Sequence, residues 1–333
     1  AQMGRNPVVV RSHMQGKVMT EADHRVILDC DPGQDDAIAI LLALASPDEI
    51  DLLAITTVAG NVPLALTARN ARRICELARR PDLPVFAGCP RPMIRLLTTA
   101  EQVHGETGLD GCSLPDPVME LRDMHAVDYL VRTIRSRPEG EITLAITGPM
   151  TNVAQAIIQA PDIAGRLREI VLMGGAWQDG NVTPVAEFNI YADPHAAAVV
   201  FGCGARITMF GLNVTHKVIT TTDRLDRLKA IGGDVGREVG NILGFYDRND
   251  PDRYGGLAGA PLHDPCVIGY LINPALFQGR ECNVQVETTS ELTMGQTVVD
   301  WWGRTGVPAN AMVMQEADAD GFYDLLTERL ARL

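Results

Sequence analysis

The sequence predicts an α/β fold, in which one large domain forms around an open, mostly parallel β-sheet flanked by helices. Short apolar runs typical of buried parallel strands alternate with helical patterns along the chain. Such alternation indicates β-α-β crossovers, with helices covering both faces of the sheet. The 333 residues are enough for a large core, and no linker or internal repeat divides them.

The individual elements follow from the same patterns. Apolar runs predict six buried strands, at residues 26–28, 52–58, 84–86, 142–146, 170–173 and 207–210. Helical periodicity predicts helices at residues 35–45, 63–80, 126–137, 152–159 and 193–201. The region 223–254 is also predicted to be helical, with a polar loop at 247–256, and another apolar helix follows from Val267.

The first residues carry neither strand nor helix periodicity. They also lack the apolar core of a signal peptide, and Met19 offers a natural start. We therefore expect residues 1–24 to be a disordered leader or residues left from cloning. The folded domain is expected to cover residues 25–333.

The composition indicates a soluble cytoplasmic protein with a small-molecule ligand. Hydrophobic residues make up 46% and charged residues 21% of the chain, as in ordinary globular proteins. The net charge is −13 and no basic stripe is present, which argues against a nucleic-acid partner. The longest apolar run, residues 37–45, is too short to cross a membrane. Seven cysteines without a CxxC pair favour reduced thiols.

The segment 29–36 is the most informative part of the chain, because it carries four carboxylates at a predicted strand-to-helix turn. Ligands of open α/β sheets bind at the carboxyl ends of the strands. Four like charges there require a cation or shifted protonation, and hard divalent ions take oxygen ligands. A favourable interaction with the helix N-terminus would explain Asp35 and Asp36 but not Asp29 and Asp31. The sequence therefore predicts a metal site.

Two further loops follow predicted strands. Asn61 ends an Ala-Gly-Asn turn, for which a simple turn is an equally good explanation. The glycine-rich segment 104–111 begins with His104 but lacks the lysine and the spacing of a P-loop. The sequence thus brings polar residues to the sheet edge without defining a phosphate site.

The strand end at residues 145–152 leads into a helix that Thr151 or Asn152 is expected to cap. The backbone carbonyl of Thr147 remains available to a metal ion. Asp264 precedes Pro265, a pattern typical of a helix N-cap. One carboxylate can cap a helix and bind a metal through different oxygens, so both interpretations of Asp264 stay open.

Glu187 and Asn189 are two residues apart, so in an extended segment they project to the same side. A carboxylate and an amide on one face suit the recognition of sugar hydroxyls. This pair therefore predicts a site for a polyhydroxylated ligand.

Taken together, these segments resemble the inosine–uridine-preferring nucleoside hydrolase family, and they occur in the family's order. The resemblance runs from about Val26 to the C-terminal region and implies the Rossmann-like nucleoside hydrolase fold. It rests on five motifs: Asp29-x-Asp31-x-x-x-Asp35-Asp36, Ala59-Gly60-Asn61, His104-Gly105-Glu106-Thr107-Gly108, the segment from Gly180-Asn181-Val182-Thr183 through Glu187-Phe188-Asn189, and His263-Asp264.

The resemblance implies calcium-dependent hydrolysis of the N-glycosidic bond of ribonucleosides to free base and ribose. By resemblance, Asp31, Asp36, Asp264 and the carbonyl of Thr147 bind Ca²⁺, with a water and the ribose 2′- and 3′-hydroxyls as its other ligands. Asp31 is also the implied general base toward the attacking water.

Other residues are implied to hold the ribose. Asp35 would bind the 2′-hydroxyl and Asn61 the 2′/3′ edge, while Met173 packs beneath the sugar. The 3′- and 5′-hydroxyls would contact Asn181, Glu187 and Asn189. Asp29 would orient its neighbours.

The chemistry of the residues agrees with this assignment. Cleavage of an N-glycosidic bond passes through an oxocarbenium-like transition state, whose positive charge a fixed acidic pocket stabilises. No second carboxylate is evident to protonate the leaving base. His263 is the best candidate for that acid, because an ordinary histidine pKa of about 6.5 lies near neutrality. A lone histidine is more often structural, but the neighbouring Asp264 favours the catalytic role.

The base pocket favours pyrimidines. Purine-specific relatives place tryptophans around the base, whereas this chain has His104 and His263 at the matching positions, and Trp177 follows a strand-end cluster. The loop 247–256, with Tyr254, is expected to close over the base. Uridine and cytidine are therefore the expected substrates and inosine a secondary one; Gln34, inside the first motif, gives no guidance.

Several alternatives remain. The enzyme could be a broad inosine/uridine or purine nucleoside hydrolase, or a non-catalytic calcium-dependent nucleoside- or ribose-binding protein. A haloacid-dehalogenase-type phosphatase needs a downstream lysine that is not evident, and no GxGxxG supports a dehydrogenase. Relatives form dimers and tetramers, so a homodimer or homotetramer acting in nucleoside salvage is expected by analogy.

Overall fold

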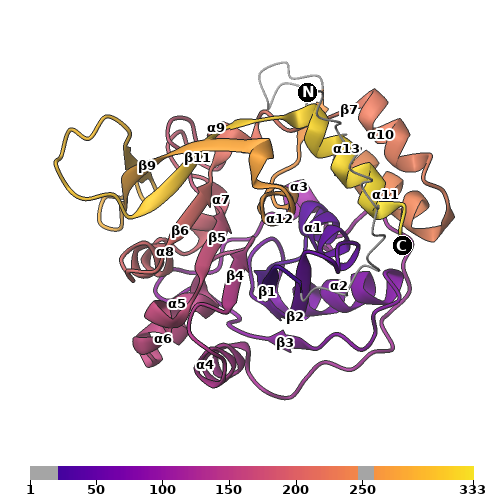
Figure 1. The fold of residues 1–333 in the computed structure, drawn as a ribbon, viewed down its shortest axis with the longest axis horizontal. Helices are drawn as coiled ribbons and strands as arrows, with labels where there is room; N and C mark the ends of the chain where they lie inside the picture. Colours follow the sequence, from indigo (N-terminus) through magenta and orange to yellow (C-terminus); the bar gives the residue numbers. More distant parts are fainter. Residues whose placement is uncertain (1–21, 247–258) are drawn as a thin grey trace, which may run out of the picture.

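The computed structural model describes residues 22–246 and 259–333. Within them, nine strands form one sheet in the order β10-β9-β11-β6-β5-β4-β1-β2-β3, and β7 pairs with β8 in a small second sheet. Helices cover the large sheet on both sides (Figure 1). The strands are β1 (His24–Cys30), β2 (Ile50–Thr57), β3 (Val85–Ala87), β4 (Ile142–Ile146), β5 (Glu169–Met173), β6 (Ile207–Phe210), β7 (Ile219–Thr221), β8 (Gly259–Pro261), β9 (Phe277–Val286), β10 (Thr297–Asp300) and β11 (Ala311–Ala317).

The predicted helices are also present, with boundaries shifted by up to three residues. The structure adds several short helices and a 12-residue C-terminal helix that the sequence did not indicate. The helical elements are α1 (Gln34–Leu44), α2 (Leu64–Leu77), α3 (Glu101–His104), α4 (Ala126–Ser136), α5 (Thr151–Gln159), α6 (Asp162–Arg166), α7 (Phe188–Ala192), α8 (Pro194–Phe201), α9 (Leu212–Thr215), α10 (Thr222–Lys229), α11 (Gly233–Tyr246), α12 (Pro265–Ile272), η2 (Pro274–Leu276) and α13 (Ala319–Leu330).

The predicted α/β class and the parallel sheet are confirmed. Strand β1 lies between β4 and β2 and runs parallel to both. From β1 the chain builds outward to β2 and β3 on one side, and β4, β5 and β6 continue on the other. The strand order therefore reverses between β1 and β4, and a crevice at the carboxyl ends of such strands is where ligands bind.

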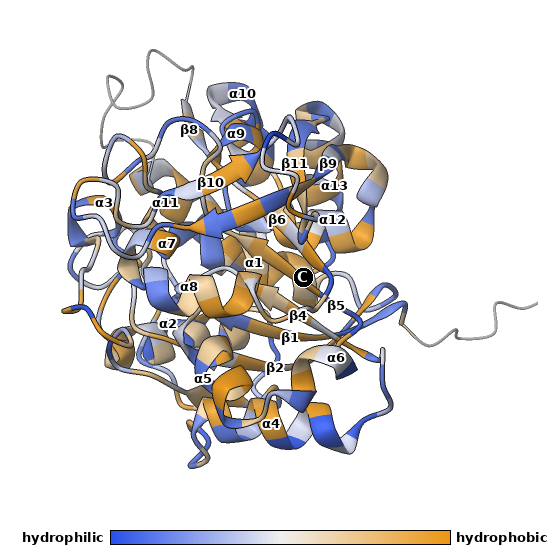
Figure 2. Cartoon of the chain, turned by 90° about the vertical axis from the view of Figure 1, so that its left-hand side faces the viewer, coloured by the Kyte–Doolittle hydropathy of each residue, from blue (hydrophilic) through white to orange (hydrophobic). Residues whose placement is uncertain are grey.

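The strands of the sheet centre are apolar along their length, whereas the outer helices expose polar residues (Figure 2). Every residue of β4 and β5 is buried, as expected for parallel strands covered on both faces. Among the residues that the structure describes, no helix is both long and apolar enough to span a bilayer.

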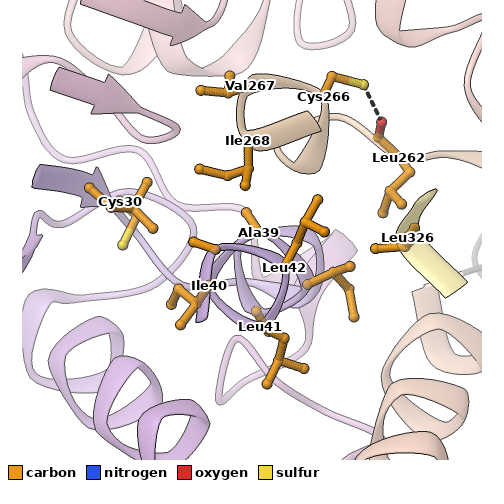
Figure 3. Close-up of a cluster of buried hydrophobic side chains, with 14 of the residues drawn as sticks. Cys30, Ala39, Ile40, Leu41, Leu42, Leu262, Cys266, Val267, Ile268 and Leu326 are labelled. Atoms are coloured by element: carbon orange, nitrogen blue, oxygen red, sulfur yellow. Dashed lines mark hydrogen bonds between the residues drawn. The ribbon is translucent and has the colours of Figure 1, made fainter. Parts of the chain in front are cut away.

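Helix α1 is buried along its whole length, because after its polar first turn its sequence is apolar on all sides. All of its residues are buried. Its side chains Ile40 and Leu42 lie in a cluster with Ile268 of α12 and Leu326 of α13 (Figure 3). This packing fixes the N-terminal end of α1, where the acidic motif is located.

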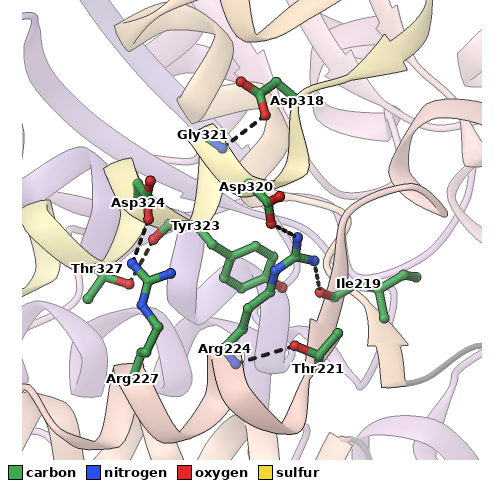
Figure 4. A network of polar contacts seen from close by, with 10 residues as sticks. All are labelled: Ile219, Thr221, Arg224, Arg227, Asp318, Asp320, Gly321, Tyr323, Asp324 and Thr327. Carbon is green, nitrogen blue, oxygen red and sulfur yellow. Dashed lines mark hydrogen bonds and ion pairs between the residues drawn. The ribbon is translucent and has the colours of Figure 1, made fainter.

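A polar network fastens α10 to α13 on the outside of the domain (Figure 4). The guanidinium of Arg224 lies 2.6 Å from Asp320 and packs over the ring of Tyr323. Arg227 lies 2.6 Å from Asp324. Both carboxylates are largely exposed, so these ion pairs add little free energy and mainly orient the helices.

The small sheet carries the chain into the site. Strand β7 pairs antiparallel with β8 from Ile219 opposite Pro261 to Thr221 opposite Gly259. The next backbone N–H, of Leu262, donates to the carbonyl of Val218 at 2.8 Å. The residues that follow directly, beginning with His263, are therefore held by the sheet that α10 and α13 support.

Two sequence expectations need correction here. Strands β7 and β8 of the small sheet, the antiparallel strands β9 and β10 and the last strand, β11, were not predicted. Residues 278–281 of β9 are exposed, so no apolar run marks that strand. Strand β1 begins at His24, one residue before the expected start of the domain. Residues 1–21 of the leader expected at residues 1–24 lie outside the described residues.

Candidate active site

The candidate site is a pocket at the carboxyl ends of β1, β4 and β5. Its position matches the crevice where the strand order reverses. Nearly all predicted substrate residues line it. The lining residues are Asp35, Asn61, Ala100, Gln102, Val103, His104, Thr147, Met173, Asn181, Val182, Glu187, Phe188, Asn189, Tyr246, His263 and Asp264.

The carboxylates of the site are almost fully buried, with at most 5% of any one exposed. Burial and, after it, the neighbouring charge of Asp35 raise the pKa of Asp36 to about 7. Burial and the charge of Asp36 raise the pKa of Asp31. The pKa of Asp264 is raised by burial and by the charge of Asp35. So much buried negative charge is stable only with protons or a cation to balance it.

Three of these carboxylates could hold a metal ion. Ligand oxygens of Asp35, Asp36 and Asp264 lie within 4.8 Å of one another. Hard divalent ions prefer such oxygen donors. The group contains two of the predicted metal ligands, Asp36 and Asp264, and adds Asp35, which the sequence assigned to the ribose.

Asp31 is held beside this group. Its Oδ2 accepts the backbone N–H of Asn61 at 2.6 Å, whereas its Oδ1 is buried without a hydrogen-bond partner among the described residues. If Gly148 carried a side chain, its Cβ would lie 2.6 Å from Oδ1 of Asp31. A Cβ at Gly60 would collide with Oδ2 of the same carboxylate. The two glycines therefore enclose the carboxylate, which explains the glycine before Asn61.

Thr147, at the end of β4, contacts the acidic group through its side chain. Its hydroxyl donates to Asp36 Oδ1 at 2.7 Å. Its carbonyl accepts the amide of Asn189 at 2.7 Å, and the same amide donates to the carbonyl of Met173 at 3.1 Å. Asn189 thus links the ends of β4 and β5. A carbonyl oxygen has two lone pairs, so one remains for another partner.

The expectation of an extended segment at Glu187 and Asn189 is wrong. Glu187 caps the short helix α7, and its carboxylate accepts the backbone N–H groups of Gly175 at 2.9 Å, Asn189 at 3.0 Å and Ile190 at 3.3 Å. Burial raises the pKa of Glu187 to about 7, although these three donors oppose the shift. The cap nevertheless places Glu187 and Asn189 in the same pocket.

Asn181 reaches the pocket from the loop before α7. Its Oδ1 accepts the backbone N–H of Phe188 at 3.0 Å. Because the amide oxygen is engaged in this way, the amide nitrogen is the group that it can offer to a ligand.

The predicted caps of α5 are also wrong. The hydroxyl of Thr151 bonds Asp193 at 2.7 Å. The amide of Asn152 donates to Asp29 Oδ1 at 2.8 Å, and Thr56 donates to the same oxygen at 2.5 Å. Asp29 does not line the pocket but lies in this buried network behind it, where burial raises its pKa to about 7. Asp264, although at the N-cap position of α12, makes no side-chain cap either.

Both predicted histidines line the pocket. The Nδ1 atom of His263 lies 2.7 Å from the hydroxyl of Thr215. The ring centroids of His104 and Tyr246 lie 5.8 Å apart. Tyr254 and the loop 247–256 lie outside the described residues. Instead, Tyr246 at the end of α11 supplies an aromatic wall that the sequence did not identify.

Trp177 does not line the pocket. Its ring stacks on that of Trp301 at 4.4 Å between centroids. Phe188 and Val103 line the pocket without having been predicted. Neither residue carries a chemical signal, so only the fold could identify them.

The comparisons with known proteins agree with this geometry. The family model described as "Inosine-uridine preferring nucleoside hydrolase" matches residues 26–324. The pyrimidine-specific ribonucleoside hydrolase RihA of Shewanella sp. (strain ANA-3) is 48% identical over 306 residues, covering 92% of this chain and 96% of that protein.

Two solved structures are also similar. A purine-preferring ribonucleoside hydrolase from Gardnerella vaginalis superposes with a TM-score of 0.86 at 31% identity, covering 92% of this chain and 98% of that one. The plant nucleoside hydrolase PpNRh1 superposes with a TM-score of 0.83 at 34% identity, covering 93% of this chain and 99% of that one.

The chain belongs to the inosine-uridine preferring nucleoside hydrolase family. It is a nucleoside hydrolase, an enzyme that cleaves the N-glycosidic bond of nucleosides. The resemblance inferred from the five motifs is confirmed, and the phosphatase and dehydrogenase alternatives are excluded.

Proposed function

We propose that this enzyme hydrolyses pyrimidine ribonucleosides, uridine and cytidine, to free base and ribose with the help of a bound Ca²⁺ ion. The carrying observation is the pocket itself, which combines buried carboxylates and amides for a ribose with two histidines for a base. Similarity to RihA, named as pyrimidine-specific, supports the choice of base.

The residues of the site fit a hard cation. Asp31 Oδ1 is a buried oxygen without a partner among the described residues. Burial and the nearby charge of Asp36, a member of the group that could hold a metal, raise the pKa of this carboxyl. We assign Asp31, Asp36, Asp264 and the carbonyl of Thr147 to the ion, and Asp35 to the ribose 2′-hydroxyl at its edge. When bound, the ion offsets the buried charge and makes a nearby water more acidic.

The chain's own residues then carry the proton transfers. Asp31, fixed by the N–H of Asn61, takes a proton from the attacking water through Oδ1. His263, held by Thr215, protonates the departing base. The fixed carboxylates stabilise the positive charge that grows on the ribose.

The ribose is held by several polar side chains around it. Asn61 and Asp35 face the 2′/3′ edge, and Met173 packs beneath the ring. The 3′- and 5′-hydroxyls are assigned to Asn181, Glu187 and Asn189. Glu187 is fixed by three backbone N–H groups, so it is positioned before the ligand binds.

A broad inosine/uridine preference is the second candidate, favoured by the description of the family. Release of reducing sugar from uridine, cytidine, inosine, adenosine and thymidine separates the two. Comparable specificity constants for inosine and uridine would support the broad enzyme. No release from any of them would instead support a non-catalytic binding protein.

We also propose a cytoplasmic homodimer or homotetramer acting in nucleoside salvage. All seven cysteines are free thiols, which suits a reducing compartment. Light scattering of the purified protein tests the assembly, and a monomeric mass would refute it.

A further inference from the structure

Gln34 connects the acidic motif to the glycine-rich loop that follows α3. It is the first residue of α1, and its side chain is fully buried. Its Nε2 donates to the carbonyls of His104 at 2.9 Å and Asp110 at 3.3 Å. Its Oε1 lies 2.6 Å from Nδ1 of His104. The amide nitrogen and the amide oxygen of Gln34 therefore both bind the segment 104–110.

These contacts determine where His104 carries its proton. The two carbonyls accept hydrogen bonds only, so the NH₂ group of Gln34 must face them and Oε1 must face the imidazole. An amide oxygen also accepts only, so Nδ1 of His104 has to be the donor. In the neutral ring, Nε2 then carries a lone pair.

The ring is also held in place. A Cβ on Gly33 would lie 2.5 Å from Nδ1 of His104, so the glycine allows the imidazole to pack directly against the backbone of the motif. Tyr246 contacts the ring at 5.8 Å, and His104 lines the pocket. His263 differs, because its Nδ1 faces the hydroxyl of Thr215, which can donate or accept.

We propose that Gln34 is a positioning residue that fixes His104 in the Nδ1–H tautomer, so that Nε2 accepts a hydrogen bond from the bound nucleoside. The inference rests on the proposed function for its ligand. The donor is an N–H of the base or an O–H of the ribose. Among the described contacts the two histidines differ, since Gln34 assigns the acceptor atom of His104 whereas the Thr215 hydroxyl suits either tautomer of His263.

The tautomer is tested directly by ¹⁵N NMR of the full-length protein with calcium added. The His104 signals are assigned by their loss in His104→Gln. The wild type is expected to show a protonated Nδ1 and an unprotonated Nε2. Gln34→Met, which is similar in size but cannot accept, is expected to lose this preference. A protonated Nε2 in the wild type, or an unchanged spectrum in Gln34→Met, would overturn the proposal.

Kinetics then identify the donor. Uridine is compared with 3-methyluridine, which lacks the base N–H, and with 5′-deoxyuridine, which lacks one ribose hydroxyl. Gln34→Met is expected to lower kcat/KM for uridine by about tenfold, the value of one hydrogen bond, chiefly through KM. The analogue without the donor is expected to be insensitive to the substitution. Equal losses for all three ligands would exclude the base N–H and the 5′-hydroxyl as the donor, and together with an unchanged spectrum in Gln34→Met they would show a merely structural role.

Asn70→Leu is the matched control. Asn70 is another buried amide, which donates to the carbonyls of Pro32 at 3.1 Å and Thr107 at 2.8 Å and so ties the same two loops together. Asn70 has no hydrogen bond with His104, so the Asn70→Leu substitution is expected to change kcat/KM equally for the three ligands and to leave the tautomer of His104 unchanged. A wild type that hydrolyses no nucleoside would refute the proposed function, while the spectrum would still decide the role of Gln34.

Discussion

Asp31 and Asn61 are joined by a hydrogen bond of 2.6 Å from the backbone N–H of Asn61 to Oδ2 of the carboxylate. The bond leaves Oδ1 as the oxygen without a partner among the described residues. This arrangement supports the roles in proton transfer and metal binding that we propose for Asp31.

The first prediction concerns this free oxygen. Asp31→Asn keeps an acceptor for the N–H of Asn61, so the fold is expected to persist. Turnover of uridine is expected to fall by about 10²–10⁴-fold, the usual contribution of a general base, and by more if the ion is lost. Glu169→Gln, at a buried carboxylate that does not line the pocket, serves as a control with unchanged turnover. Near-wild-type turnover of Asp31→Asn would remove Asp31 from the mechanism.

The second prediction concerns the metal. Calcium is expected to copurify with the protein, because a hard cation would offset the buried negative charge around Asp36. Exhaustive chelation is expected to abolish activity and lower the Tm, since a ligand that binds only the folded state stabilises it. Elemental analysis provides the measurement. Full activity of a protein without calcium would refute the assignment.

The third prediction concerns the pH dependence of the metal-free protein. Burial raises the pKa values of Asp29, Asp36 and Glu187 to about 7, while in the unfolded chain such groups titrate near pH 4. Between these values the folded state binds more protons than the unfolded state, so stability falls as the pH rises. The Tm of metal-free protein is expected to fall from pH 5 to pH 8. Calcium is expected to restore it at pH 8, and a flat profile would contradict the shifts.

The parallel half of the fold could be predicted from the sequence for a simple reason. Strands β4 to β6 are fully buried and most of β1 and β2 is, so their inner parts appear as apolar runs. The polar exposed residues of β9 have no such signal, and their pairing depends on β10 and β11, which are distant in sequence. The reversal of the strand order between β1 and β4 also has no signal in the sequence, because it is a property of how the strands are arranged in space.

The site was predictable where one residue type implies one chemistry, as at the acidic motif. Side chains with several possible partners were harder to assign. Thr151 and Asn152 suit helix caps by local rules, but distant carboxylates bind them instead. Gln34 gave no signal because its partners, His104 and Asp110, are 70 and 76 residues away.

The fourth prediction concerns the sugar. Asp35 and the metal site are both assigned to the ribose 2′-hydroxyl, and a 2′-deoxynucleoside would leave these buried groups unpaired. Sites of this kind reject the analogue by about 10⁴–10⁵-fold. The specificity constant of deoxyuridine is therefore expected to lie far below that of uridine. Comparable values for the two would contradict the assigned ribose contacts.

The last prediction concerns the base. The lining residues His104, His263 and Tyr246 offer hydrogen bonds and small rings, whereas Trp177 is stacked on Trp301 outside the pocket. An indole would favour the larger purine, since aromatic stacking contributes about 0.5–1.5 kcal/mol beyond burial. Without it, uridine and cytidine are expected to exceed adenosine and guanosine by about tenfold or more in kcat/KM. Specificity constants that favour a purine would overturn the pyrimidine preference, while the family assignment would stand.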